Sequence, residues 1–220
     1  MKRWAFVVVG LYLLMLAVLT VPVTLLAFAP QANAKDIAGA YLQFFYWFWL
    51  GVMGLAQAAL LVVPVRVANR RPVTRRSLLW PVVTAGLMMG GLAMGAMYSI
   101  GEFAARDQVP NWFWWAVIVS CAVLWCVWVV LFYRSSREAN PSDVISRQCR
   151  LLLRGSILEL LIAVPTHIVA RYRGYCCAGF MTFIGLALGI SVMIFSFGPS
   201  VFFLYVARWR RLHPEPELEA

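Results

Sequence analysis

The sequence predicts an all-α integral membrane protein: a six-transmembrane-helix bundle with its N and C termini in the cytoplasm. Three observations predict it. Of the 220 residues, 63% are hydrophobic and 13% are charged, whereas soluble domains have about 45–50% apolar and about 25% charged residues. The apolar residues form long runs without charge, and a membrane-spanning helix needs about 20 such residues. The basic residues are concentrated in alternate segments between the runs, as the positive-inside rule requires.

The expected spans are approximately residues 4–28, 38–64, 78–101, 111–133, 151–170 and 180–206. Helices are predicted because the runs lack the period-2 alternation of strands, and because a helix satisfies its own backbone groups in lipid. Residues 1–212 are therefore expected to form a single transmembrane helical domain. The last residues, 213–220, are rich in Pro and Glu and are expected to form a disordered tail.

The fifth span is the least apolar of the six, because it contains Glu159 and reaches spanning length only if Arg154 is included. The long stem of an arginine can extend to the membrane surface, and Pro165 is expected to bend the helix. With six spans, all but four of the 19 Lys and Arg residues lie inside; the four outside are Lys35, Arg106, Arg171 and Arg173. A segment that dipped in and returned would move Arg208–Arg211 outside, so a true crossing is predicted.

The N-terminal segment has an alternative interpretation as a secretory signal. Lys2 and Arg3 precede an apolar stretch that ends in Ala32-Asn33-Ala34, which resembles a cleavage site. The apolar stretch is much longer than the roughly 7–15 residues of a signal's hydrophobic region. An uncleaved first span is therefore expected, whereas cleavage would leave five spans and an external N-terminus.

Glycines spaced four residues apart predict close helix packing in the third and sixth spans. Small residues at this spacing let two helix backbones approach closely, which replaces the hydrophobic driving force that is missing in lipid. Packing within the chain is favoured over dimerisation, because a six-helix bundle must first pack its own helices. The glycines are Gly86, Gly90, Gly91, Gly95, Gly185 and Gly189.

A stripe of small and polar residues on the fifth span predicts an intramembrane polar site. Its members, at helical spacings of three and four, are Ser156, Glu159, Ala163, Thr166, Ala170 and Arg173. Ionisable groups inside a membrane are functional-site candidates, so Glu159 is one, and an ion pair with Arg154 or with an arginine of another loop is the structural alternative. Glu102, at the outer end of the third span, could meet Arg106 one turn later or share an outer vestibule with His167.

A second candidate site combines His167 with two cysteines that follow the fifth span. His167, Cys176 and Cys177 lie on one crossing and its outer turn, and imidazole with thiolate suits Zn or Cu. No further ligand cluster supports this site, so the favoured interpretation is that the two thiols pack at a helix start. Neighbouring cysteines rarely close a disulfide without strain.

No motif in the sequence identifies a function. The net charge of +10 comes from the loops and does not indicate nucleic-acid binding. A non-enzymatic accessory, assembly or structural component of a membrane complex is favoured, with lipid, other membrane subunits or a second copy as partners. One alternative is transport or binding of an ion or transition metal through a site on the fifth span and its outer turn, although no inverted repeat supports a transporter. The other is a membrane thiol oxidoreductase. The expected location is a bacterial inner (plasma) membrane.

Overall fold

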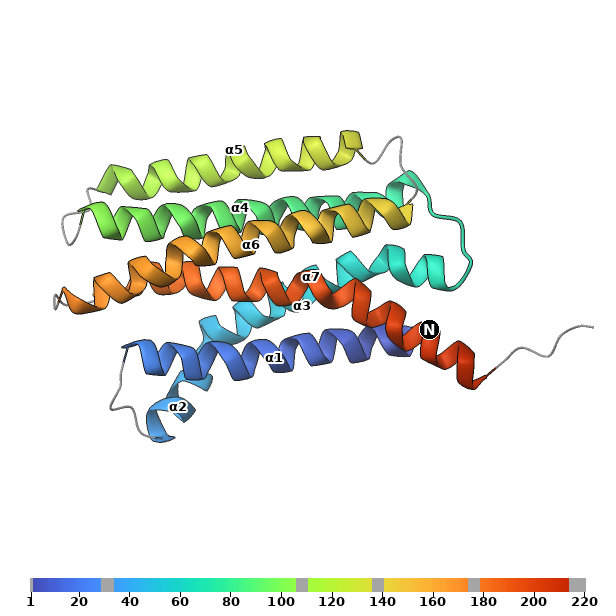
Figure 1. Cartoon of the computed structure of the whole chain (residues 1–220), viewed down its shortest axis with the longest axis horizontal. Helices are drawn as coiled ribbons and strands as arrows, with labels where there is room; N and C mark the ends of the chain where they lie inside the picture. The colour runs from blue at the N-terminus through green and yellow to red at the C-terminus, as the bar shows by residue number, and fades with distance from the viewer. Residues whose placement is uncertain (1, 29–33, 106–110, 136–140, 174–178, 214–220) are drawn as a thin grey trace, which may run out of the picture.

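The computed structural model describes residues 2–28, 34–105, 111–135, 141–173 and 179–213. Within these ranges the chain forms seven α-helices and no strand (Figure 1). The helices are α1 (Lys2–Phe28), α2 (Ala34–Tyr41), α3 (Phe44–Ala68), α4 (Arg75–Ala105), α5 (Asn111–Ser135), α6 (Pro141–Tyr172) and α7 (Phe180–Leu212). The predicted all-helical architecture is confirmed. Of the predicted tail, residues 214–220 lie outside the described residues.

Six of the described helices are long and apolar enough to cross a membrane, which confirms the expected number of candidate spans. Their apolar stretches are Lys2–Thr20, Tyr46–Ala68, Ser77–Ala104, Trp115–Ser135, Asp143–Tyr172 and Phe180–Leu212. The first residue of α1 and the last residue of α7 lie at one end of the bundle, here called the terminal end (Figure 1). The opposite end, where α4 and α6 finish and α7 begins, is called the far end.

The second predicted span is not one continuous helix. The structure divides residues 34–68 into α2 and α3, with the chain extended at Gln43, which has φ −71° and ψ 125°. The Trp47 indole N–H donates to the Tyr41 carbonyl at 2.5 Å, which closes the turn between the two helices. Apolar residues flank this break on both sides, so hydropathy alone does not reveal it.

The fifth span is longer than predicted. α6 begins at Pro141, whereas the span was expected over residues 151–170. In the first turns of α6 one face is buried, and its residues follow helical spacing. They are Val144, Ile145, Gln148, Cys149 and Leu152. Arg147, Arg150 and Arg154 are exposed on other faces of the same helix. The basic segment before the span is thus the first part of the crossing helix, and its apolar face packs in the bundle.

The centre of the bundle consists of α4, α6 and α7, which pack against one another. α1 packs on α3 and α7, while α5 lies on the outer side of α4 (Figure 1). The main core cluster combines residues of α1, α3, α4, α5, α6 and α7, among them Leu16, Leu60, Val82, Leu152 and Phe195. The functional candidates on α6 therefore lie at the centre of the fold.

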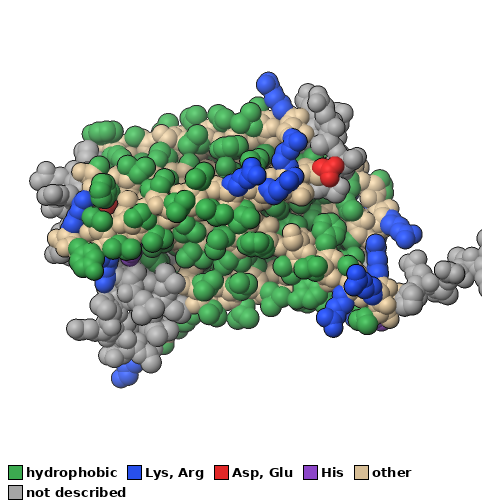
Figure 2. Space-filling model, in the orientation of Figure 1, with side chains coloured by type: hydrophobic (Ala, Val, Ile, Leu, Met, Phe, Trp, Pro, Cys, Tyr) green, Lys and Arg blue, Asp and Glu red, His purple; other side chains and the backbone are tan. Residues whose placement is uncertain are grey.

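The surface matches a lipid environment. Hydrophobic side chains cover most of the visible face, and Lys and Arg side chains lie at both ends and in one group on the upper half, between the middle and the terminal end (Figure 2). Large apolar side chains such as Leu14, Leu158, Leu161 and Leu204 are exposed on several helices. A soluble protein rarely exposes so large a contiguous apolar area, whereas lipid tails solvate it directly.

The predicted packing glycines all lie at contacts within the chain. A Cβ at Gly90 of α4 would lie 3.5 Å from the Cys121 carbonyl oxygen of α5, and one at Gly86 would collide with Val129 of α5. Cys121 Sγ donates to the Gly90 carbonyl at 3.3 Å, which ties the same two helices together. The second pair of α4 glycines, Gly91 and Gly95, faces α7 instead.

Candidate functional site at the junction of α4, α6 and α7

The predicted polar stripe lies on α6, and most of it is buried. Its buried members are Ser156, Glu159, Ala163 and Ala170. Thr166 is half-buried, and its hydroxyl donates to the Ile162 carbonyl of its own helix at 2.7 Å. The next residue, His167, is buried where Thr166 was expected to be. The stripe thus faces inward and includes His167.

The Glu159 carboxyl occupies a space left by three glycines of two other helices. Only 3% of Glu159 is exposed. A Cβ at Gly95 of α4 or at Gly185 of α7 would lie 2.9 Å from Glu159 Oε1, and one at Gly189 would overlap Oε2. Gly95 and Gly185 also let their helices touch, since a Cβ at Gly95 would lie 3.1 Å from the Gly185 Cα. We call the space bounded by Gly95, Gly185 and Gly189 the glycine niche.

Neither carboxyl oxygen of Glu159 has a hydrogen-bond partner among the described residues. Arg154 is exposed on the same helix, and the ion pair between these two residues, considered from the sequence, is not formed. Ser99 of α4 borders the niche, and its buried Oγ also has no hydrogen-bond partner within the described ranges. Burying an ionised carboxylate without a partner costs several kcal/mol. The niche therefore suits a carboxyl that is neutralised by a proton or by a small cation.

Glu102, the other buried acid among the described residues, is fully engaged at the far end. Its carboxyl oxygens accept hydrogen bonds from the backbone N–H of Gly179 at 2.5 Å and of Thr182 at 2.8 Å. These amides belong to the N-terminus of α7, where the first N–H groups of a helix lack partners within the helix. A carboxylate there also interacts favourably with the positive end of the helix dipole. Glu102 of α4 thus caps α7.

Thr182 connects Glu102 to His167. The His167 Nδ1 lies 2.8 Å from Thr182 Oγ1, and the Thr182 hydroxyl donates to the Gly179 carbonyl at 3.0 Å. Glu102 and His167 therefore contact the same residue of α7, and the outer vestibule that they were expected to share stays a prediction. Arg106, the other suggested partner, lies outside the described residues. This far-end cluster of Glu102, His167 and Thr182 holds α4, α6 and α7 together.

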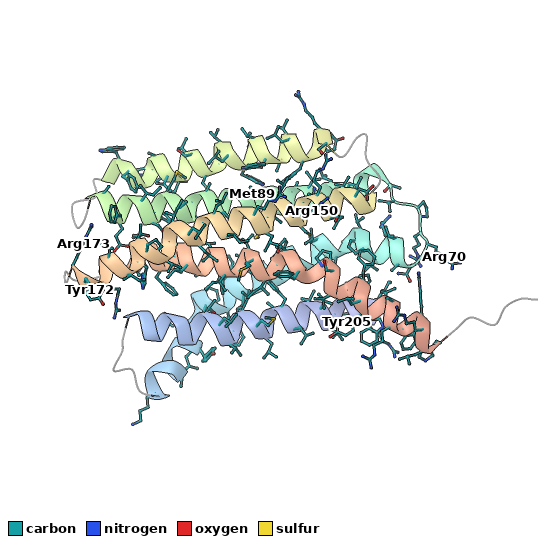
Figure 3. The ribbon with its side chains drawn as sticks, in the orientation of Figure 1. Arg70, Met89, Arg150, Tyr172, Arg173 and Tyr205 are labelled. Carbon is teal, nitrogen blue, oxygen red and sulfur yellow. The ribbon has the colours of Figure 1, made fainter. Side chains whose placement is uncertain are left out.

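Arg173 strengthens the same junction. Its guanidinium donates to the carbonyls of Glu102 at 3.3 Å and Phe103 at 2.8 Å, and it lies 5.0 Å from the centre of the Phe103 ring. Figure 3 shows Arg173 and Tyr172 at the far end, opposite Arg70 and Tyr205 at the terminal end. The basic residue that completes the predicted stripe therefore binds the end of α4.

The predicted metal site falls mostly outside the described residues. Cys176 and Cys177 are not among them, so only His167 of that set is placed. Within the described ranges, no three His, Cys, Asp or Glu side chains come together in a way that could hold a metal ion. Glu159 and His167 are eight residues apart on α6, about 12 Å along the axis at 1.5 Å per residue. The niche and the far-end cluster are thus two separate polar sites.

Two buried glutamines were missed in the sequence. Gln57 of α3 and Gln148 of α6 are almost fully buried, and none of their amide atoms has a hydrogen-bond partner in the described part of the chain. Gly198 of α7 makes room for Gln57, since a Cβ there would overlap its amide nitrogen. In the sequence each glutamine is a single polar residue on an otherwise apolar helix face. This pattern is the signal from which the two buried glutamines could have been predicted.

The chain matches no known protein-family model, and no curated protein and no solved structure is detectably similar to it.

Proposed function

We propose that this chain is a membrane transport or coupling protein in which Glu159 reversibly binds a proton or an alkali cation. The observation that carries the proposal is a carboxyl group that is buried at the junction of three helices without a hydrogen-bond partner among the described residues. Ionisable groups in membrane interiors typically mark ion pathways or proton relays.

The composition of the niche supports a proton or a hard cation as the ligand. Besides the Glu159 carboxyl, the groups nearest to the niche glycines include the Ser99 hydroxyl at Gly185 and the apolar Leu160 at Gly189, and the backbones of Gly95 and Gly185 lie against each other. Oxygen donors suit hard cations, whereas Zn and Cu prefer nitrogen and sulfur. Among the described residues, the atoms nearest to the three niche glycines include no charged side chain other than that of Glu159. This supports a bound proton or cation as the group that neutralises the carboxyl. A metal site at His167, Cys176 and Cys177 stays a separate hypothesis.

The proposed topology places both termini in the cytoplasm of a bacterial cell, with the protein in the inner membrane. The positive-inside rule supports this orientation, because the terminal end carries Lys2, Arg66, Arg71 and Arg210 among other basic residues. In this topology the far-end cluster faces outward, and the glycine niche lies between the two surfaces. An ion that moved between the sides would pass Glu159.

Infrared spectroscopy of the purified protein in lipid tests the proposal. A protonated carboxyl has its own C=O stretching band, and the band assigned to Glu159 is the one that disappears in Glu159→Gln. We expect this band to decrease reversibly as the pH rises or as Na⁺ or Li⁺ is added. A Glu159 band that stays constant over every pH and cation concentration at which the protein remains folded would identify an inert packing group and refute the proposal.

A second candidate function, an accessory subunit of a membrane complex, rests on α5. This helix packs mainly on α4 and exposes a broad apolar face that includes Trp115, which is 70% exposed. Such a face can receive helices of another subunit as well as lipid. Native mass spectrometry after extraction in a mild detergent tests this candidate. A chain that is always isolated alone, also after crosslinking in the membrane, would count against it.

A further inference from the structure

Two hollows at the terminal end share one basic rim. The first, of about 360 Å³, lies between α1 and α3, and the second, of about 720 Å³, lies between α1 and α7. Lys2, Asn69 and Arg71 line both. Arg66 adds a further positive charge to the first hollow and Arg3 to the second. Among the described lining residues no side chain is acidic, so this rim attracts an anion.

The walls of the first hollow are apolar below the rim. On α1 they consist of Ala5, Phe6 and Val9, and on α3 of Ala58, Leu61, Val62 and Val65. α1 leaves the terminal end while α3 returns to it, so the basic residues of both helices lie together and both apolar walls extend in the same direction. From Lys2 to Val9 the wall is about 10 Å long at 1.5 Å per residue, roughly a third of the hydrocarbon core of a bilayer.

A rigid turn positions Arg71 at this rim. After α3 ends, the Arg71 N–H donates to the Arg66 carbonyl at 3.0 Å and the Arg70 N–H donates to the Val67 carbonyl at 3.1 Å. This is the pattern of a Schellman motif, in which the residue in the left-handed conformation is usually glycine. Here it is Arg70, with φ 53°. The Asn69 amide adds a bond to the Val65 carbonyl at 2.7 Å, so the turn is held at three points.

Aromatic side chains border the second hollow. Trp4 stacks on Tyr205 with 4.9 Å between ring centres, and Trp209 lies edge-on to Trp4 at 6.2 Å. Trp and Tyr rings prefer the head-group region of a membrane. The rim is therefore at the depth where lipid phosphates lie, and the apolar walls are at the depth of the first part of the acyl chains.

We propose that these joined hollows bind an anionic phospholipid, with its phosphate against Lys2, Arg66 and Arg71 and an acyl chain along the wall between α1 and α3. Charge complementarity and the apolar wall both select this ligand: a free phosphate would use only the rim, and a neutral lipid only the wall. The proposal does not depend on the role of Glu159.

Native mass spectrometry of the protein released from nanodiscs tests the proposal, with equimolar phosphatidylglycerol and phosphatidylcholine as probes. We expect wild-type protein to retain phosphatidylglycerol preferentially. Each basic residue near the surface contributes on the order of a fivefold gain in affinity for anionic lipid, so Arg66→Gln combined with Arg71→Gln is expected to lower the affinity roughly 30-fold.

A matched control removes the same charge from the same end. Arg208→Gln combined with Arg211→Gln changes two exposed arginines that line neither hollow, and it is expected to retain the lipid. Equal loss in both double variants would show a diffuse effect of charge and overturn the proposal. Thermal unfolding without added lipid verifies that all variants are folded.

A third variant tests the apolar wall. Ala58→Phe fills the first hollow and leaves every basic residue in place, so it is expected to weaken binding of long-chain phosphatidylglycerol several-fold. Inorganic phosphate and the water-soluble glycerophosphoglycerol head group serve as further probes. If either competes with the lipid at equal concentration, or if Ala58→Phe has no effect, the site binds phosphate alone and the lipid proposal is refuted.

Discussion

Gly189→Ala directly tests the glycine niche, because an added methyl group meets only side chains there. A Cβ at residue 189 would overlap the Glu159 carboxyl and lie 2.8 Å from Leu160 Cγ and Cδ2. Carbon atoms in contact are normally about 3.5–4.0 Å apart, so the neighbours must move by roughly 1 Å. Overpacking of this kind costs about 1–3 kcal/mol, and the higher helix propensity of alanine offsets about 1 kcal/mol of this cost. For a chain of this length the net loss corresponds to a melting temperature lowered by up to roughly 8 °C.

Thermal unfolding in a mild detergent measures this effect, with two other glycines as controls. At Gly51 of α3 an added Cβ has nothing within 4 Å, and at Gly91 of α4 its nearest neighbour is Leu188 Cδ2 at 3.8 Å. Because alanine favours a helix over glycine by about 1 kcal/mol, both control variants should unfold at or slightly above the wild-type temperature.

A double variant assigns the clash to the carboxyl. Glu159→Ala removes the group that the new methyl overlaps, so it should restore part of the stability lost in Gly189→Ala. If Gly189→Ala melts together with Gly51→Ala, or if Glu159→Ala restores nothing, the carboxyl does not occupy the niche and the reasoning about Glu159 is wrong.

Further predictions use the same unfolding assay. Arg70→Gly should raise the stability by about 1 kcal/mol, because glycine adopts the left-handed conformation without strain. Arg70→Ala should give no gain in stability, and an equal gain in both variants would disprove strain as the cause. Glu102→Gln should lower the stability by about 1–3 kcal/mol, because it weakens the charge-assisted bonds to the α7 amides. Glu159→Gln should cost less than Glu102→Gln, and the opposite order would show that Glu159 has a partner of its own.

The helices were predictable because the information for them is local. A long apolar run without charge predicts a spanning helix, and four-residue glycine spacing predicts close packing. The break at Gln43 was not predictable, since it depends on the bond from Trp47 to Tyr41 within an equally apolar segment. The early start of α6 was hidden by its exposed arginines, which suggested a loop.

The candidate site was predictable only in part. Helical spacing placed Glu159 on an inward face, and the structure buries it there. The same spacing chose Thr166, whereas His167 is the buried residue, because Thr182 of α7 lies beside its ring at the far end. The contact from Glu102 to Thr182 joins residues 80 positions apart, and periodicity within one helix contains no information about such a pair.

The two buried acids explain why Glu159 is the better candidate for function. Glu102 is an example of a structural carboxylate in this bundle. Its oxygens accept hydrogen bonds from two backbone N–H groups at the N-terminus of α7, where the helix dipole also stabilises a negative charge. Glu159 receives no such partner among the described residues, and three helical glycines leave room for it although each is about 1 kcal/mol less favourable than alanine in a helix. An apolar residue of similar volume would often pack as well or better. Because stability alone would not select such a carboxyl, we propose that Glu159 is retained to bind a proton or a cation.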